Sequence, residues 1–219
     1  MNRGMPIRKT SEVDDSGAWL SIGDLMSGLL MIFALLLISA LVQISDVNEK
    51  SQNNRVIIIK GINNSLASAG IDVQADPETG DISILDSVLF GHDDYKLKQS
   101  GKDFLNSFVP LYGDVIFQSV EVSEEVVRIV IEGHTSKEGS FNYNMKLSLL
   151  RANSVSEYIR SMRFQDKPAF FDKVLISGRG PLDANINKVS AEDRKVKFRL
   201  QFKGQQFLTS LGTEVTSVE

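Results

Sequence analysis

Leu25–Ile44 reads LMSGLLMIFALLLISALVQI and contains no charged residue. As an α-helix, these twenty residues would be about 30 Å long, which matches the hydrocarbon core of a bilayer. The apolar pattern continues back to Trp19, and tryptophan is enriched at the membrane interface. The sequence therefore predicts one transmembrane helix, over residues 17–45.

Asp24 is the one charged residue within this predicted helix. One interpretation is an ordinary helix N-cap, because aspartate at a helix start accepts N–H bonds and suits the helix dipole. The other is a carboxylate inside the membrane, since Trp19 at the headgroups would put Asp24 about 7 Å deeper. A charged aspartate near a bilayer centre costs about 3 kcal/mol, so it usually faces a protein partner or a water path. We expect this second arrangement, which makes Asp24 a candidate ion-carrying residue.

The charges that precede the span predict its orientation. Arg3, Arg8 and Lys9 place residues 1–16 in the cytoplasm by the positive-inside rule. The apolar run is longer than that of a signal peptide and lacks a small-residue cleavage site, so we expect it to remain in the protein. The rest of the chain would then lie outside, as a connector over 46–69, a folded domain over 70–204 and a C-terminal tail over 205–219.

The connector carries Ile58, Ile59, Ile62 and Leu66 at helical spacing, which predicts an amphipathic helix. Two partners for this apolar face remain open. One is the same helix in a second copy of the chain, and the other is the connector's own folded domain.

The composition argues against several classes of function. The chain has 219 residues, a net charge of −4 and no cysteine, so it lacks both a basic nucleic-acid-binding character and thiols for catalysis, disulfides or zinc. His134 lies two residues from Ser136 in one loop, where a nucleophile and its base seldom align, and no third group is evident. His92 precedes two aspartates in a pattern typical of a solvated turn. We therefore expect no enzyme, no bound metal and no cofactor.

Apolar patterns predict the elements of the folded domain. Residues 71–74 and 81–85 flank a turn at 76–80 and predict a hairpin. Helices are expected at 97–112 and 142–163, because apolar residues recur there at helical spacing. Further strands are expected at 87–90, 127–132, 174–177 and 195–202. This order predicts an α+β domain in which a mixed sheet carries helices on one face.

One stretch carries most of the candidate chemistry, from the loop Gly133–Gly139 into a helix that contains Arg151. Arg151 lies among apolar neighbours, where a guanidinium group can bind a carboxylate through two parallel hydrogen bonds. The helix start at Asn142–Asn144 adds N–H donors that favour anions. Alternatively, Arg151 is a surface residue or forms an internal ion pair with Glu157 or Asp193.

Several separated motifs, over roughly residues 85–203, resemble those of the OmpA-like peptidoglycan-binding domain. They are GHT-x-x-x-G at 133–139, YN-x-x-LS-x-x-RA at 143–152, GRG at 178–180 and DRKV at 193–196. The resemblance implies that the domain binds peptidoglycan through Thr135, Ser136, Tyr143, Asn144, Leu147, Arg151 and Arg194. The family usually carries an aspartate where this chain has Ser136, which implies a weaker grip on the ammonium group of the wall peptide.

The single span, with Asp24 in the pattern W-x-x-x-x-D-L-M, is similar to that of MotB-type stator subunits. Within them, the short connector and the His-Thr-Ser loop resemble the MotB-like subunits of Zorya anti-phage systems. The resemblance implies that Asp24 carries protons, or sodium ions, across a bacterial inner membrane, with the C-terminal domain in the periplasm. It also implies a homodimer within a five-to-two complex with a MotA- or ZorA-like multi-span subunit. A flagellar-type stator subunit and a static wall tether without ion transport are the alternatives.

Overall fold

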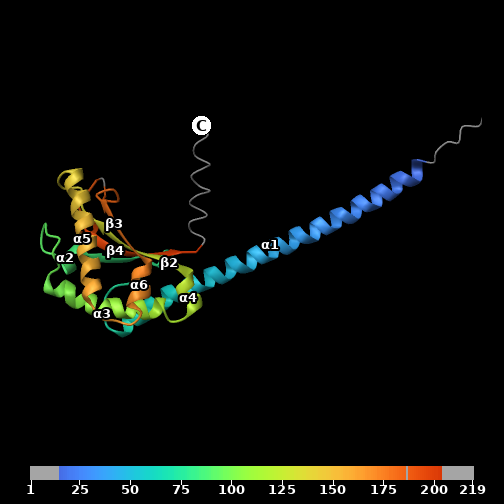
Figure 1. Ribbon diagram of the computed structural model, residues 1–219. Helices are drawn as coiled ribbons and strands as arrows, with labels where there is room; N and C mark the ends of the chain where they lie inside the picture. The colour runs from blue at the N-terminus through green and yellow to red at the C-terminus, as the bar shows by residue number, and fades with distance from the viewer. Residues whose placement is uncertain (1–14, 186, 204–219) are drawn as a thin grey trace, which may run out of the picture. The chain divides into compact units, whose positions relative to one another are not determined.

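The computed structural model describes residues 15–185 and 187–203, and the chain divides into two compact units, Met1–Glu49 and Lys50–Glu219. Helix α1 (Asp15–Ser68) contains the whole predicted span and all but the last residue of the predicted connector (Figure 1). The predicted tail at 205–219, and the predicted cytoplasmic tail apart from residues 15 and 16, lie outside the described residues.

The part of α1 in the first unit has an apolar and exposed surface. Leu25 is 74% exposed and Leu30 is 72% exposed. The helix is long and apolar enough to cross a membrane, where lipid would cover these side chains. Asp24 lies inside α1, which already begins at Asp15, so the N-cap interpretation of Asp24 is wrong.

The second unit is built on a four-stranded mixed sheet with the order β1-β4-β2-β3. Its strands are β1 (Ile82–Leu85), β2 (Val126–His134), β3 (Val174–Gly180) and β4 (Lys195–Phe202). β2 and β3 are parallel, whereas β4 is antiparallel to both β1 and β2. Along β4, buried and partly exposed residues alternate, as the sequence pattern predicts.

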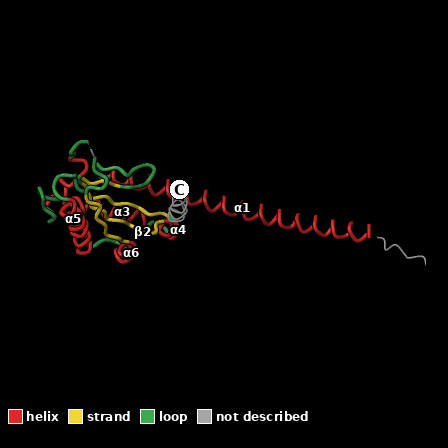
Figure 2. The backbone as a smooth tube through the Cα atoms, turned by 90° about the horizontal axis from the view of Figure 1, so that it is seen from above, coloured by secondary structure: helices red, strands yellow, loops and turns green. Residues whose placement is uncertain are grey.

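Within residues 15–185 and 187–203, helices cover one face of this sheet and leave the other without a helical layer (Figures 1 and 2). The predicted α+β architecture is therefore confirmed. The α-helices of this unit that follow α1 are α2 (Asp86–Leu89), α3 (Gln99–Ile116), α4 (Val120–Glu125), α5 (Phe141–Ser161) and α6 (Lys167–Lys173), and a 3-10 helix spans Ala191–Asp193.

One hydrophobic core lies between the sheet and the helices of the second unit. Phe108 of α3 packs against Phe198 of β4 with ring centroids 5.0 Å apart. The end of α1 enters the same core, since Ile58 is 0% exposed and Ile62 is 1% exposed. Of the two partners considered for the connector's apolar face, the structure shows the connector's own domain.

Two predicted strands are wrong. Residues 87–90 mostly form helix α2, because a short apolar run does not distinguish a strand from a buried helical turn. Residues 71–74 form no strand, and β1 pairs with β4 instead. The side chain of Asn63 on α1 bonds both backbone groups of Ala75, at 2.7 Å and 3.3 Å. This segment therefore bonds to α1, and only an isolated bridge remains of the hairpin.

Two glycines let α5 lie directly on the sheet. A Cβ atom on Gly133 of β2 would lie 2.0 Å from the carbonyl oxygen of Ser148, and one on Gly178 of β3 would lie 2.7 Å from the Ser148 hydroxyl. The Ser148 hydroxyl also accepts a hydrogen bond of 2.9 Å from the Gly180 N–H. This close approach fixes the position of α5, and with it the side chain of Arg151.

Candidate functional site

Arg151 of α5 is buried, with 1% of the residue exposed, beside a buried carboxylate. Its Nη1 lies 3.3 Å from Oδ2 of Asp86, the first residue of α2, and its Nε donates to the Asp94 carbonyl at 2.9 Å. Burial lowers the pKa of Arg151, while the charges of Asp86 and Asp93 partly offset this effect. Arginine remains charged in proteins, so Asp86 and Arg151 form a buried ion pair.

Arg194 converges on the same carboxylate from the loop that leads into β4. Its Nε lies 3.4 Å from Asp86 Oδ2, and its Nη1 lies 3.8 Å from Glu138 Oε2. The Arg194 carbonyl also accepts a hydrogen bond of 3.0 Å from the Asp86 N–H. Asp86 thus joins Arg151 and Arg194, which the resemblance to OmpA-like domains places in one site. The alternative prediction, that Arg151 pairs with Glu157 or Asp193, is wrong.

Residues at the start of α5 bind the loops around this ion-pair cluster. The Tyr143 hydroxyl donates to Asp93 Oδ1 at 3.0 Å, and this hydrogen bond raises the pKa of Tyr143. The Asn144 side chain donates to the Glu138 carbonyl at 2.7 Å. Leu147, one turn before Arg151, is buried. Tyr143 alone of these three predicted site residues is exposed, so it can meet a ligand without rearrangement.

Thr135 and Ser136 follow β2 and are 3% and 4% exposed. The Thr135 N–H donates to the Gly180 carbonyl at 2.9 Å, whereas Thr135 Oγ1 has no hydrogen-bond partner among the described residues. Within that part of the chain, no hydrogen bond or ion pair links either residue to Arg151 or Arg194. Ser136 therefore supplies neither charge nor an exposed hydroxyl to the site.

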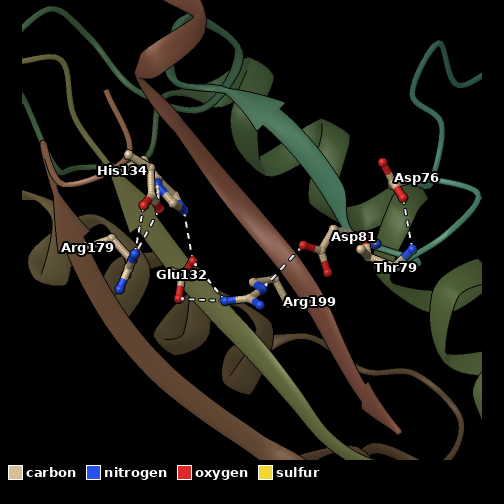
Figure 3. Close-up of polar contacts among 8 residues, drawn as sticks. Asp76, Thr79, Asp81, Glu132, His134, Arg179 and Arg199 are labelled. Atoms are coloured by element: carbon tan, nitrogen blue, oxygen red, sulfur yellow. Dashed lines mark hydrogen bonds and ion pairs between the residues drawn. The ribbon is translucent and has the colours of Figure 1, made fainter. Parts of the chain in front are cut away.

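A second polar cluster lies where β2 and β3 end, and Figure 3 shows it in part. His134 Nε2 lies 3.0 Å from Glu132 Oε1, and His134 Nδ1 lies 3.5 Å from Asp183 Oδ2. Arg199 Nη1 lies 3.3 Å from Glu132 Oε2, and Arg179 Nη2 lies 2.7 Å from Asp183 Oδ1. Both ring nitrogens of His134 face carboxylates, so neither is aimed at Ser136 as a base would be.

The ligand atoms of Glu132, His134 and Asp183 lie within 4.8 Å of one another, which raises the question of a metal. The two carboxylates face different nitrogens of one imidazole ring, and these nitrogens point in different directions. A single ion bound to His134 would thus have one carboxylate on the wrong side of the ring. Each carboxylate also has a guanidinium partner, so the cluster fits an ion-pair network better than a metal site.

In this network the pKa values of Glu132 and Asp183 are both lowered. Burial raises the pKa of Glu132, but the hydrogen bond with His134 and the charge of Arg199 outweigh it, and the net pKa is lowered. The hydrogen bond from Arg179 lowers the pKa of Asp183. Both carboxylates are therefore held ionised. They tie the end of β2 to the loop after β3, beside the chain segment that carries Thr135.

Asp86, Asp93 and Asp94 contact the predicted site residues but were absent from the sequence prediction. Asp86 stands at the start of a short apolar run that was interpreted as a strand. Asp93 has a φ of 54°, a left-handed conformation in which Asp and Asn are enriched. The pattern around Asp93 and Asp94 indicated a turn, but nothing in it indicated contact with a helix some fifty residues later in the chain.

The pattern of the OmpA family matches residues 89–199, which contain Arg151, Arg194 and the loops around them. The chain belongs to the OmpA family. Two curated relatives, each named Zorya protein ZorB and each from a strain of Escherichia coli, are similar over most of their length. One is 24% identical over 90% of this chain and 85% of the relative, and the other is 27% identical over 86% and 88%.

A solved structure of a MotB-like protein from Desulfovibrio vulgaris has a similar fold. Its TM-score is 0.52 at 20% sequence identity, and the match covers 72% of this chain and 96% of that one. The chain therefore joins an OmpA-family domain with a MotB-like fold to one helix able to span a membrane. This arrangement fits a single-pass inner-membrane protein.

Proposed function

We propose that this chain is the wall-bound subunit of an ion-driven inner-membrane motor of the ZorB type, acting in anti-phage defence. The observation that carries the proposal is Asp24, a carboxylate inside the apolar part of α1. No ion pair neutralises it within the described part of the chain. Such a group is costly in lipid, so it requires partner helices or a bound cation.

In this function, Asp24 binds a proton, or a sodium ion, from the periplasm and releases it toward the cytoplasm. Each charge that crosses the membrane supplies about 2.3 kcal/mol per 100 mV. The partner would be a MotA- or ZorA-like multi-span subunit, five copies of which surround two copies of α1. The N-terminus would be cytoplasmic and the OmpA-family domain periplasmic.

The domain would hold the motor in place by binding peptidoglycan. The curated relatives and the OmpA-family match support this role, as does the convergence of Arg151 and Arg194 on one ion-pair cluster. Thr135, Ser136, Tyr143, Asn144 and Leu147 would form the surroundings of the bound peptide. Because Ser136 is buried and uncharged, we expect weaker binding than in family members that have an aspartate there.

The test is Asp24→Asn in cells that also produce the membrane partner and are challenged with phage. We expect the efficiency of phage plating to rise to the level of cells without the system, while the amount of protein in the membrane and its binding to peptidoglycan are unchanged. Asp46→Asn is the matched control, because it makes the same change on the same helix outside the apolar run.

Full protection by the Asp24→Asn protein would refute ion transport through Asp24 and leave a static wall tether. The flagellar alternative is tested separately, by asking whether the chain and its partner restore swimming to cells that lack their own stators. Restored swimming, without any effect on phage plating, would overturn the defence role and support a flagellar-type stator.

A further inference from the structure

Residues 70–74, which we call the strap, connect the end of α1 to the chain segment that leads into β1. A groove of about 700 Å³ separates the strap from β1 and α3, and another of about 520 Å³ lies between the strap and α1. The apolar residues that line the larger groove are Ile71, Val73, Ile84, Leu85, Val88 and Phe104. The strap therefore has space on both sides.

Both ends of the strap are fixed by hydrogen bonds. At one end, the N–H groups of Gly70 and Ile71 donate to carbonyls in the last turn of α1, at 3.1 Å and 3.0 Å. Just beyond the other end, Ala75 is bonded to the Asn63 side chain and forms an isolated antiparallel bridge to Ile82 of β1. Movement of the strap is thus limited to the residues between these two anchors.

One tight turn directs the strap away from β1. The Val73 N–H donates to the Ile71 carbonyl at 2.9 Å, which is the hydrogen bond of a γ-turn centred on Asp72. Such a turn is held by a single hydrogen bond, and water or a neighbouring strand can replace that bond at little net cost. Opening the turn would leave residues 71–74 free to extend.

The sequence of the strap fits a fifth strand beside β1. Antiparallel pairing that continues from the bridge at Ala75 would give the opposed pairs Gln74–Ser83, Val73–Ile84 and Asp72–Leu85. Along β1, Ile82 and Ile84 are buried, whereas Ser83 and Leu85 are exposed. In this register Val73 would lie on the buried face, and the polar residues Asp72 and Gln74 would lie on the exposed face.

β1 also has a free edge for this pairing, because it is an outer strand of the sheet and pairs with β4 on one side. The Asp86 N–H donates to the Arg194 carbonyl, at the residue that precedes β4. Backbone groups alternate in direction along a strand, so the N–H of Ile84 also points to β4. The N–H groups of Ser83 and Leu85 then point the other way, and both residues line the groove.

We propose that the strap switches between the turned form of this structure and a closed form in which it extends the sheet beside β1. Closure brings the half-buried side chains of Ile71 and Val73 into the groove, against Phe104 of α3. The end of α1 selects between the forms, since the turned form keeps Ile71 bonded to α1 and the closed form moves it to the sheet. The inference depends on neither ion transport nor wall binding.

The test is disulfide formation in the full chain, purified in detergent, since the protein has no cysteine of its own. Asp72→Cys with Leu85→Cys places two thiols opposite each other in the closed form, where Cα atoms about 5.5 Å apart suit a disulfide. Gln74→Cys with Ser83→Cys, next to the existing bridge, is the positive control. Gln74→Cys with Leu85→Cys is the negative control, because diagonal residues lie about 7–8 Å apart.

Under a mild oxidant, we expect the pair at 72 and 85 to form a bond within one chain at least about five-fold faster than the diagonal pair. Equal rates for these two pairs, while the positive control reacts, would overturn the strap. A disulfide between two chains carrying Leu85→Cys alone, in place of the bond within one chain, would also overturn it and would show that this edge pairs with a second copy.

A second arm measures hydrogen exchange of the Leu85 N–H in cysteine-free variants. Asp72→Thr favours an extended strand, whereas Asp72→Asn removes the same charge and keeps a residue that suits turns. We expect exchange at Leu85 to be about three-fold slower in Asp72→Thr than in Asp72→Asn, because the closed form protects this N–H. Equal exchange in the two variants would contradict closure onto β1.

Discussion

Replacing Arg151 by methionine is expected to destabilise the OmpA-family domain by about 3 kcal/mol. Breaking a buried ion pair by removing one partner costs about 3–5 kcal/mol, because the other charge stays buried. Asp86 is 9% exposed and would keep only Arg194, whose Nε lies 3.4 Å away. That remaining partner puts the cost at the lower end of the range. Methionine fills a similar volume, so the change reports on charge more than on packing.

The assay is urea denaturation and thermal unfolding of a fragment that covers residues 50–219, a unit with its own hydrophobic core. A loss of about 3 kcal/mol corresponds to a fall in Tm of about 6–12 °C for a domain of this size. Asp86→Asn alone should also destabilise, because it leaves Arg151 buried without its counter-charge. In the double variant the two costs should fall short of additivity by about 1–3 kcal/mol. Additive costs, or a loss below about 1 kcal/mol for Arg151→Met, would refute the buried pair.

Two further predictions concern the connector and the second polar cluster. Ile62→Ala should destabilise the same fragment by about 2–5 kcal/mol, whereas Ile57→Ala, at a residue 53% exposed, should change its stability by less than about 0.5 kcal/mol; equal effects would contradict a core role for the connector. Because the folded-state pKa of Glu132 is lowered, its contribution to stability is present above about pH 4.5 and is lost as pH falls through the folded pKa. Unfolding measured from pH 7 to pH 3 should therefore show a shallower loss of stability for Glu132→Gln than for the wild type, and parallel curves would contradict it.

The sequence predicted the regular parts of the fold because their patterns are long. β4 alternates over its whole length, and α5 repeats its apolar face over several turns. The predictions were wrong where a few residues depend on a distant partner. Residues 71–74 looked like one arm of a hairpin, but Asn63 of α1 takes the backbone groups of Ala75. The short helices α4 and α6 were missed, because helices of six or seven residues give too few repeats for a periodic pattern.

The candidate site, too, was predicted only in part. The resemblance to OmpA-like motifs selected Arg151 and Arg194, and the structure brings both to one carboxylate. Their partner, Asp86, was not predicted, because the pairing of β1 with β4 decides that the first residue of α2 lies beside Arg194. The sequence also could not predict that Arg151 is buried. A loop some fifty residues earlier in the chain covers it through the Asp94 carbonyl, and no local pattern encodes that contact.

Asp24 and Asp86 differ in how their charge is balanced. Asp86 pairs with two arginines of the same domain, so its charge is neutralised inside the chain and holds these side chains in position. Asp24 sits on an exposed helical surface, and in the described residues no cation pairs with it. A carboxylate in hydrocarbon needs a counter-charge or a proton. If α1 spans the membrane as proposed, the charge of Asp24 would be balanced by a partner helix or by an ion that binds and leaves. The second source is what a motor requires and what a static tether does not.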